Sequence, residues 1–300
     1  NILSQAKVPL PVKEGECGLR QSDALFAHIK NLPLLAASVR EMLSGDVPLA
    51  VGVSEKPRNQ KNSYMPCFLA GVSAAESIGA ALGIPVCRFS HQCGHIRAAL
   101  YSSGQSVLRE TAFGAFHISG GTTETLLCTP AENGFHAEIV GGTADLHAGQ
   151  LIDRVGVMLG LPFPCGPALE TLARENRKPI PKRKVKTENG FLHLSGFENL
   201  ARKLYEDTRD KALTAAYVQY LLAEGVTAMS RDFRSAYPGE AGEPVPLVYA
   251  GGVMSNGYIR EWVQRRLDNT FFAAPVFSAD NAAGIALLTA ETLLKRQNRS

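Results

Sequence analysis

Apolar residues recur at helical spacing in two long segments of the chain. Residues 22–43 and 210–236 place them three and four positions apart, which predicts amphipathic helices. Pro33 lies inside the first segment, and a proline there removes a helical hydrogen bond and crowds the preceding turn. We therefore expect the first helix to be kinked or split at this residue.

Short apolar or β-branched runs occur between the helical segments and predict strands. These runs are VPLAVGVSE, GIPVCRFS, GAFHISG, ETLLCTP, VPLVYAGGV and APVFSA. Three of them lead directly into helix-like sequence, and this strand–turn–helix order is typical of α/β layers. In contrast, AFHISGGTTETLLCTP has two apolar runs around a Gly-Gly turn, which predicts a hairpin. The pattern as a whole favours an α/β fold.

The composition is that of an ordinary globular protein. Of the 300 residues, 45% are apolar and 20% are charged, and the net charge of +3 predicts no strong field toward nucleic acids or membranes. The six cysteines form no C-x-x-C pair, which indicates a reduced, cytoplasmic protein without a disulfide or zinc-ribbon framework. No apolar run is long enough to span a membrane, and the amino end lacks the apolar core of a signal peptide.

A basic, proline-broken stretch at residues 175–190 is predicted to be a surface loop. It holds six basic residues between Arg177 and Lys186. A solvated loop is the simpler interpretation, and contact with tRNA phosphates is the alternative.

The sequence SHQCGH holds two histidines four residues apart. If a helix begins here, His91 and His95 lie on one face, where two imidazoles can share a divalent ion. A zinc protease of the H-E-x-x-H type needs a glutamate where this chain has Gln92, and glutamine cannot accept a proton at neutral pH. The spacing therefore disfavours a protease but leaves open both a metal site and a polar start of a helix.

Other positions could contact a ligand through backbone or carboxylate groups. Ser119–Thr123, SGGTT, could hold an anion or form a plain hairpin turn. Gly251 and Gly252 follow an apolar strand and precede a helix, as at many nucleotide sites, without the complete G-x-G-x-x-G sequence. Asp153 lies in an apolar stretch, which favours a buried partner or ligand. Asp280 is either a helix N-cap or an oxygen ligand for a metal.

The order of these motifs resembles the TsaD family, the glycoproteases, whose members are threonylcarbamoyl transferases for tRNA adenosine. The resemblance runs from about residue 22 to residue 295 and includes LGLPFPCGPALE, AGGVMSN and DNAA. It implies an actin-like ATPase (ASKHA) fold of two RNase H-like domains with a central ligand cleft. The first domain would be residues 1–110 completed by the helix at 281–300, and its first strand is absent either from this sequence or from the protein. The second domain would be residues 111–280 with a helical insertion.

The resemblance also implies roles for individual residues. By position, His91, His95 and Asp280 match the metal ligands of the family. The residues at positions that contact nucleotide or substrate are Ser119, Gly120, Gly121, Thr122, Thr123, Asp153, Gly166, Gly251, Gly252 and Asn256. The implied cofactors are a divalent metal (iron or zinc, or magnesium with a nucleotide) and ATP or an acyl-adenylate. The implied partners are tRNA and the proteins of a threonylcarbamoylation complex, with no membrane.

The implied reaction moves threonylcarbamoyl from its adenylate to a tRNA adenosine or a related acceptor, with a metal as Lewis acid and template and without a protein nucleophile. Four residues depart from the family pattern: Cys93, Leu146 and Gln150 replace acidic residues, and Thr122 replaces a histidine. These departures favour a diverged paralogue. It would be either an acyltransferase or a non-catalytic scaffold that binds nucleotide and metal, and a metallopeptidase is a third alternative.

Overall fold

The chain forms two compact units, which we describe separately. The computed structural model describes residues 2–11, 19–132, 134–239, 242–278 and 281–298. Unit 1 comprises residues 1–98, 130–136 and 280–300, and unit 2 comprises residues 99–129 and 137–279. None of the described helices combines the length and apolarity needed to cross a lipid bilayer.

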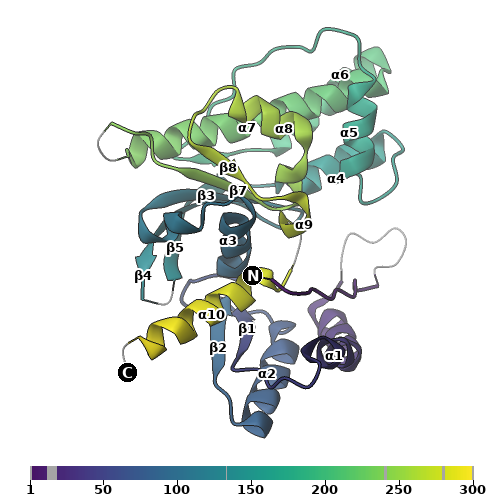
Figure 1. Ribbon diagram of the computed structural model, residues 1–300. Helices are drawn as coiled ribbons and strands as arrows, with labels where there is room; N and C mark the ends of the chain where they lie inside the picture. Colours follow the sequence, from purple (N-terminus) through teal and green to yellow (C-terminus); the bar gives the residue numbers. More distant parts are fainter. Residues whose placement is uncertain (1, 12–18, 133, 240–241, 279–280, 299–300) are drawn as a thin grey trace. The chain divides into compact units, whose positions relative to one another are not determined.

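Unit 1 is built on a short parallel sheet (Figure 1). Its strands are β1 (Val51–Lys56) and β2 (Val86–Ser90), and its helices are α1 (Gln21–Leu43), α2 (Phe68–Leu82), the first turns of α3 (His91–Ser102) and α10 (Ala283–Gln297). A Cβ on Gly52 would meet Ile285 of α10, whereas Val53 faces Gly71 of α2. Because adjacent strand residues point to opposite faces, α10 and α2 cover the two sides of this sheet.

A buried ion pair ties α10 to α3 within unit 1. The guanidinium of Arg97 donates to Glu291 Oε1 through Nε at 2.9 Å and through Nη2 at 2.7 Å. The Arg97 side chain is only 4% exposed and that of Glu291 is 16% exposed. A segment from the end of the chain therefore helps to complete a unit whose other parts come early in the sequence.

Unit 2 contains a six-stranded mixed sheet in the order β6-β5-β4-β3-β7-β8. The strands are β3 (Phe113–Ile118), β4 (Thr123–Ala131), β5 (Gly134–Thr143), β6 (Phe191–Leu192), β7 (Leu247–Ala250) and β8 (Thr270–Phe272). The helices are α4 (Ala148–Met158), α5 (Gly166–Arg174), α6 (Ser195–Thr208), α7 (Lys211–Ala236), α8 (Gly257–Gln264) and α9 (Pro275–Ser278), with 3₁₀ turns η1 (Ser106–Glu110) and η2 (Gly252–Ser255). Strands β3 and β4 are antiparallel, and β3, β7 and β8 are parallel.

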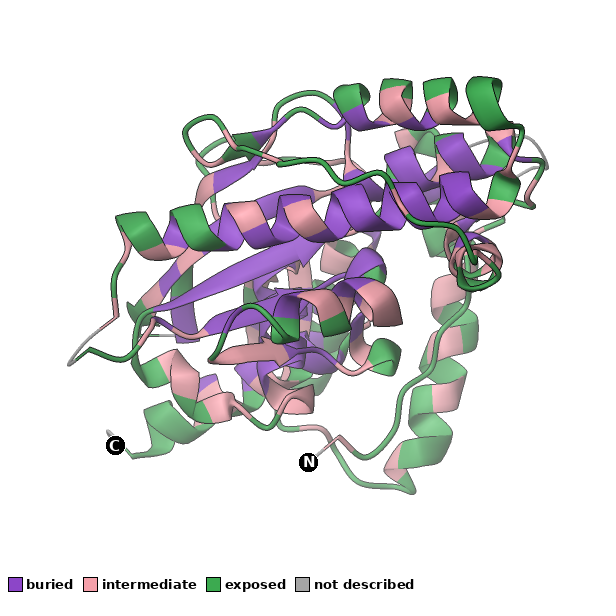
Figure 2. Ribbon diagram, turned by 90° about the horizontal axis from the view of Figure 1, so that it is seen from above, coloured by how far each residue is buried: buried purple, intermediate pink, exposed green. Residues whose placement is uncertain are grey.

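The core of unit 2 lies between this sheet and α7, which is buried along most of its length (Figure 2). Tyr249 stacks between Phe116 and Phe272, with ring centroids 4.9 Å and 4.6 Å away. Its hydroxyl pairs with Ser230 of α7 at 2.7 Å, so the buried phenol is satisfied. Asp210 begins α7 as an N-cap, because its side chain accepts from Leu213 N.

The structure confirms the two long predicted helices as α1 and α7, and the predicted hairpin as β3–β4. Of the kink or split predicted at Pro33, the split does not occur, because α1 continues through that residue. Residue 29, whose carbonyl loses its helical partner, is 52% exposed and can be solvated.

The strand predicted at residues 274–279 is also wrong. Residues 275–278 form the short helix α9, and the edge strand β8 precedes it. Pro275 occupies the first helical position, which the fixed φ of proline favours. The two units are compact regions of the chain, and the predicted RNase H-like domains and ligand cleft stay a prediction.

Candidate functional site

The histidine pair lies at the start of α3, directly after β2. Ser90 ends the strand and caps the helix, since its Oγ accepts from Cys93 N at 3.2 Å. One helical turn brings the side chains of His91 and His95 together, with their Nε2 atoms 3.0 Å apart and their rings nearly perpendicular at 86°. Phe68 of α2 contacts the His91 ring edge-on at 5.6 Å. Local helix geometry therefore produces the pairing that the spacing predicts.

The two imidazole nitrogens fit two positions of one metal ion. Two nitrogens bound to a tetrahedral Zn²⁺ at about 2.0–2.1 Å would be about 3.3 Å apart, close to the 3.0 Å seen here. The predicted third ligand, Asp280, lies outside the described residues. Within the described ranges, no group of three or more His, Cys, Asp or Glu side chains could hold a metal. The metal site therefore stays a prediction that rests on the pair.

Cys93 lies between the histidines in sequence but does not take the place of the family's acid. Its side chain is 5% exposed, and Asn59 Nδ2 donates to its sulfur at 3.5 Å. Burial raises the pKa of the Cys93 thiol, although a hydrogen bond with Ser90 and the charge of Lys56 oppose the rise. The residue is therefore a neutral thiol near pH 7.

In unit 2, two glycine-containing turns meet at one edge of the sheet. Because β3 and β7 are parallel neighbours, their carboxyl ends lie side by side. The turn after β3 is closed by Ser119 N, which donates to Thr122 O at 2.7 Å. The turn after β7 begins with Gly251, whose φ of +97° and closeness to Ile118 exclude a side chain.

The amino end of α4 packs onto the first of these turns. Gly149 N donates to Ser119 O at 3.1 Å, and Thr123 Oγ1 accepts from Ala148 N at 2.9 Å. A Cβ on Gly149 would lie 2.5 Å from Gly120 Cα, so the helix approaches the turn closely. The first two N–H groups of α4 are therefore already paired within unit 2, and the helix contributes the positive end of its dipole to this turn.

Open space lies beside four glycines of unit 2. At Gly120, Gly121 and Gly252 of this edge, and at Gly166 at the start of α5, no atom beyond the chain neighbours lies within 4 Å of where a Cβ would stand. We refer to Ser119–Thr123 with Gly251–Gly252 as the glycine edge. Nucleotides bind at the carboxyl ends of strands in many open α/β sheets, and the glycine edge is such a position.

Asp153 joins α4 to the start of α5. Its Oδ1 accepts from Cys165 N at 2.8 Å, directly before Gly166. Burial raises the pKa of the Asp153 carboxyl, and the bond from Cys165 only partly opposes this. Asn256 has a separate local role, because its Oδ1 caps α8 by accepting from Ile259 N at 3.0 Å. Among the described residues, no hydrogen bond joins Asp153 to Asn256.

Glu170 is a positioning residue that the sequence interpretation missed. Its Oε1 accepts from Gly257 N at 3.1 Å and from Arg174 Nη2 at 2.7 Å. It thereby links α5, which begins at Gly166, to the residue after Asn256. An acid in the largely apolar sequence GPALETLA was the available signal.

Asp145 and Gln150 form hydrogen bonds at the starts of two helices. Asp145 accepts from Leu194 N at 2.8 Å, from Ser195 N at 3.1 Å and from the Ser195 hydroxyl, and so caps α6. Burial would raise the pKa of Asp145, but these hydrogen bonds outweigh it and lower that pKa. Gln150 forms a capping box with His147 at the start of α4.

Comparisons with known proteins match most of the chain. A family model described as "TsaD: tRNA N6-adenosine threonylcarbamoyltransferase" matches residues 64–287. A protein of that name from Streptococcus suis (strain 05ZYH33) is 31% identical over 229 residues, which are 73% of this chain and 65% of the relative. One from Thermosipho africanus (strain TCF52B) is 26% identical over 273 residues, which are 87% of this chain and 78% of the relative. The chain thus spans less than two thirds of the streptococcal protein's length.

A solved structure supports the fold. The structure titled "Crystal structure of T.kodakarensis HypF" superposes with a TM-score of 0.56 at 12% sequence identity, and covers 75% of this chain and 39% of that one. At this identity the likeness concerns the fold alone. The mixed α/β architecture with a central sheet is consistent with an ASKHA-type fold.

Proposed function

Because the chain belongs to the tRNA N6-adenosine threonylcarbamoyltransferase (TsaD) family, we propose that it is a metal-dependent acyltransferase. It would move a threonylcarbamoyl group from its adenylate to a tRNA adenosine or a related acceptor. The observation that carries the proposal is the convergence of His91 and His95, whose Nε2 atoms are 3.0 Å apart. When bound by this pair and Asp280, a divalent metal would supply Lewis-acid and template chemistry.

The glycine edge of unit 2 supports the nucleotide part of the proposal. No neighbouring atom occupies the positions where a Cβ would stand on Gly120, Gly121 and Gly252, so the phosphate of the adenylate would approach the backbone there. Negative charge develops on this phosphate when the acceptor amine attacks the carbamoyl carbon and AMP leaves. Fixed backbone donors and the N-terminus of α4 would stabilise that charge without reorganising.

Asp153 would hold the ribose of the adenylate. Its Oδ1 already accepts from Cys165 N, so Oδ2 is the oxygen that remains for a ribose hydroxyl. Burial raises the pKa of this carboxyl and strengthens any hydrogen bond that it makes. The backbone at Gly166 lies directly beside this position and is open to a ligand.

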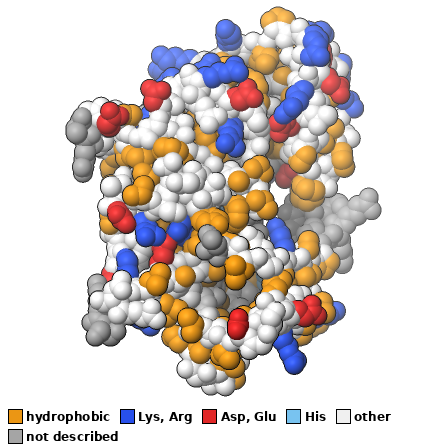
Figure 3. Space-filling view, in the orientation of Figure 1, with side chains coloured by type: hydrophobic (Ala, Val, Ile, Leu, Met, Phe, Trp, Pro, Cys, Tyr) orange, Lys and Arg blue, Asp and Glu red, His pale blue; other side chains and the backbone are white. Residues whose placement is uncertain are grey.

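The basic loop at residues 175–190 would contact the tRNA phosphates. Tyr220 of α7 fixes the loop, since its hydroxyl accepts from Arg183 N at 3.0 Å and donates to Arg183 O at 3.1 Å. Lys182, Lys184 and Lys186 are exposed. Figure 3 shows Lys and Arg side chains gathered at the top of the view, over the part of unit 2 where Figure 1 draws α6 and α7. This surface fits a polyanion, and a tRNA substrate places the proposed activity in the cytoplasm.

Two measurements test the proposal. The purified protein is loaded with Zn²⁺ or Fe²⁺ and its metal content is measured by elemental analysis, and transfer of labelled threonine onto tRNA is measured with the other proteins of a threonylcarbamoylation system. We expect about one metal per chain and labelled tRNA, with both lost in His91→Ala. The matched control is His28→Ala, which removes an exposed histidine of α1. Wild-type protein that binds no metal after loading contradicts the proposal.

A non-catalytic scaffold is the second candidate, and the neutral thiol of Cys93 favours it. At this position the family has an acid, whereas burial keeps Cys93 uncharged. Asp145, which belongs to the family's acidic pair, is occupied with the cap of α6. A scaffold would bind metal and adenylate but produce no labelled tRNA in the complete system. The variant Cys93→Glu restores the acid. Labelled tRNA from this variant indicates that the natural chain has lost the activity, and its absence indicates an acceptor other than tRNA.

A further inference from the structure

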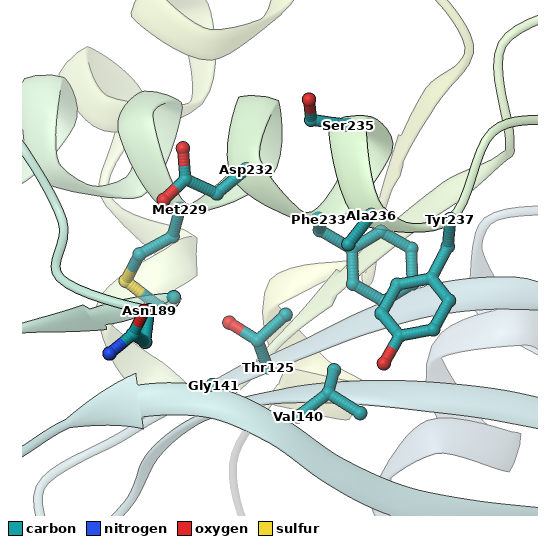
Figure 4. Close-up of a pocket in the computed structure, with 11 residues that line it drawn as sticks. Thr125, Val140, Gly141, Asn189, Met229, Asp232, Phe233, Ser235, Ala236 and Tyr237 are labelled. Atoms are coloured by element: carbon teal, nitrogen blue, oxygen red, sulfur yellow. The ribbon is translucent and has the colours of Figure 1, made fainter.

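Unit 2 contains a cavity of about 420 Å³ between the last turns of α7 and strands β4 and β5. It shares no residue with the glycine edge or with Asp153, Gly166 and Asn256. Figure 4 shows side chains of α7 on one side of the cavity and those of the strands on the other. Its volume lies within the range of about 300–1,000 Å³ that is usual for small-molecule sites.

The helix side of the cavity carries apolar side chains beside Asp232 and Ser235. Met229 and Phe233 are 1% and 4% exposed, and Tyr237 continues the wall after the helix ends. The rings of Phe233 and Tyr237 lie 4.9 Å apart at a tilt of 39°. Val140 lines the strand side (Figure 4). This wall would cover the apolar body of a ligand.

A buried hydroxyl lies on the strand side. Thr125 of β4 is 3% exposed, and in the part of the chain that the structure describes its Oγ1 has no hydrogen-bond partner. Thr125 lies on the strand side of the cavity (Figure 4), and its oxygen is almost wholly covered by neighbouring atoms. Buried hydroxyls without a partner are rare in folded proteins. A donor or acceptor group of a ligand would satisfy it.

A carboxylate lies at the cavity, beside the loop of residues 175–190. Asp232 is the charged residue among the residues that line the cavity, and the Thr187 hydroxyl donates to Asp232 Oδ2. No described Lys, Arg or His side chain forms an ion pair with Asp232. The cavity also lies at the C-terminal end of α7, where the helix dipole is negative. The basic residue of that last turn, Arg234, donates to the backbone carbonyls of Val245 and Asp268 and not to the cavity.

From these features we propose that the cavity binds a small organic cation, an ammonium or guanidinium group on an apolar body. The cation lies at Asp232 and the C-terminal end of α7. The apolar body packs against Met229, and a polar group at the other end reaches Thr125. An anion is repelled at the mouth, and an entirely apolar ligand leaves the Thr125 hydroxyl unsatisfied.

The test compares two probes of nearly equal shape. Tyramine carries an ammonium group where tyrosol carries a hydroxyl, and agmatine supplies a guanidinium on an aliphatic chain. Binding to the full chain is measured by ligand-observed NMR titration at low salt. We expect tyramine to bind about tenfold more tightly than tyrosol, which corresponds to a partly screened ion pair.

Variants assign the preference to the cavity. Asp232→Asn is expected to remove the preference for tyramine, and Thr125→Val is expected to weaken tyramine and tyrosol alike. Both changes keep the side-chain volume, and circular dichroism checks the fold. The matched control Asp207→Asn, on the exposed surface of α6, should leave every affinity unchanged. Equal affinity of the two probes for the wild-type protein, an unchanged preference in Asp232→Asn, or no saturable binding of tyramine and agmatine overturns the proposal.

Discussion

The same substitution at two adjacent glycines of the glycine edge should change the free energy of unfolding by very different amounts. Gly251 has φ +97° and ψ 157°, a conformation open essentially only to glycine, where another residue costs about 1–3 kcal/mol. An alanine Cβ there would also lie 2.2 Å from the carbonyl oxygen of Ile118, so the ends of β7 and β3 must separate. Such overpacking typically adds about 1–3 kcal/mol. We therefore expect Gly251→Ala to lower the free energy of unfolding by about 2–6 kcal/mol.

The substitution Gly252→Ala is the matched control for stability. A Cβ at Gly252 meets no atom within 4 Å, so the free energy of unfolding should change by less than about 0.5 kcal/mol. If the backbone at this residue contacts the adenylate phosphate, the added methyl group should nevertheless weaken nucleotide binding. The pair of variants thus separates a structural glycine from a ligand-binding one.

Urea unfolding followed by tryptophan fluorescence measures these changes. The chain has a single tryptophan, Trp262, which lies in α8 of unit 2 and contacts Tyr220 and Tyr258. The signal therefore reports on the unit that contains both glycines. An unfolding free energy of Gly251→Ala within about 1 kcal/mol of the wild type would refute the argument from close approach.

Three further predictions concern charged groups. Glu291→Ala removes an ion-pair partner of the buried Arg97 and should cost about 3 kcal/mol in urea unfolding, whereas Glu76→Ala, in an exposed pair, should cost less than about 1 kcal/mol. Because folding lowers the pKa of Asp145, its ionised form stabilises the protein above pH 3.8; the stability difference between wild type and Asp145→Asn should shrink as the pH falls below that value. Because burial raises the pKa of Asp153, the folded state binds its proton more tightly than the unfolded state. Thermal unfolding should therefore show Asp153→Asn gaining stability relative to wild type as the pH rises above 3.8. Calorimetry should show that the same variant binds nucleotide more weakly.

Features that depend on local sequence could be predicted. The spacing of apolar residues located α1 and α7, and the turn between β3 and β4 was evident from its two glycines. The pairing of His91 with His95 also follows from one helical turn. The short elements were missed for a physical reason. β6 has two residues and α9 has four, too few for either periodicity to show.

The remaining features depend on packing between distant parts of the chain. Glu170 reaches Gly257 because α5 and α8 both pack against α7, and nothing in either segment indicates the other. The cavity exists because β4 places Thr125 beneath the last turns of α7, more than a hundred residues later in the sequence. The apolar residues that follow Thr125 indicate a buried strand, but not that the Thr125 hydroxyl would lack a partner among the described residues.

The arrangement of unit 1 has a consequence for how the protein is made. Its small sheet is covered on one side by α10, whereas every described element of unit 2 is complete by residue 278. During synthesis, residues 1–98 must therefore wait until α10 has left the ribosome before unit 1 is complete. Until then the α10 side of β1, including Gly52, is uncovered, and a chaperone would have its longest access to the nascent chain there.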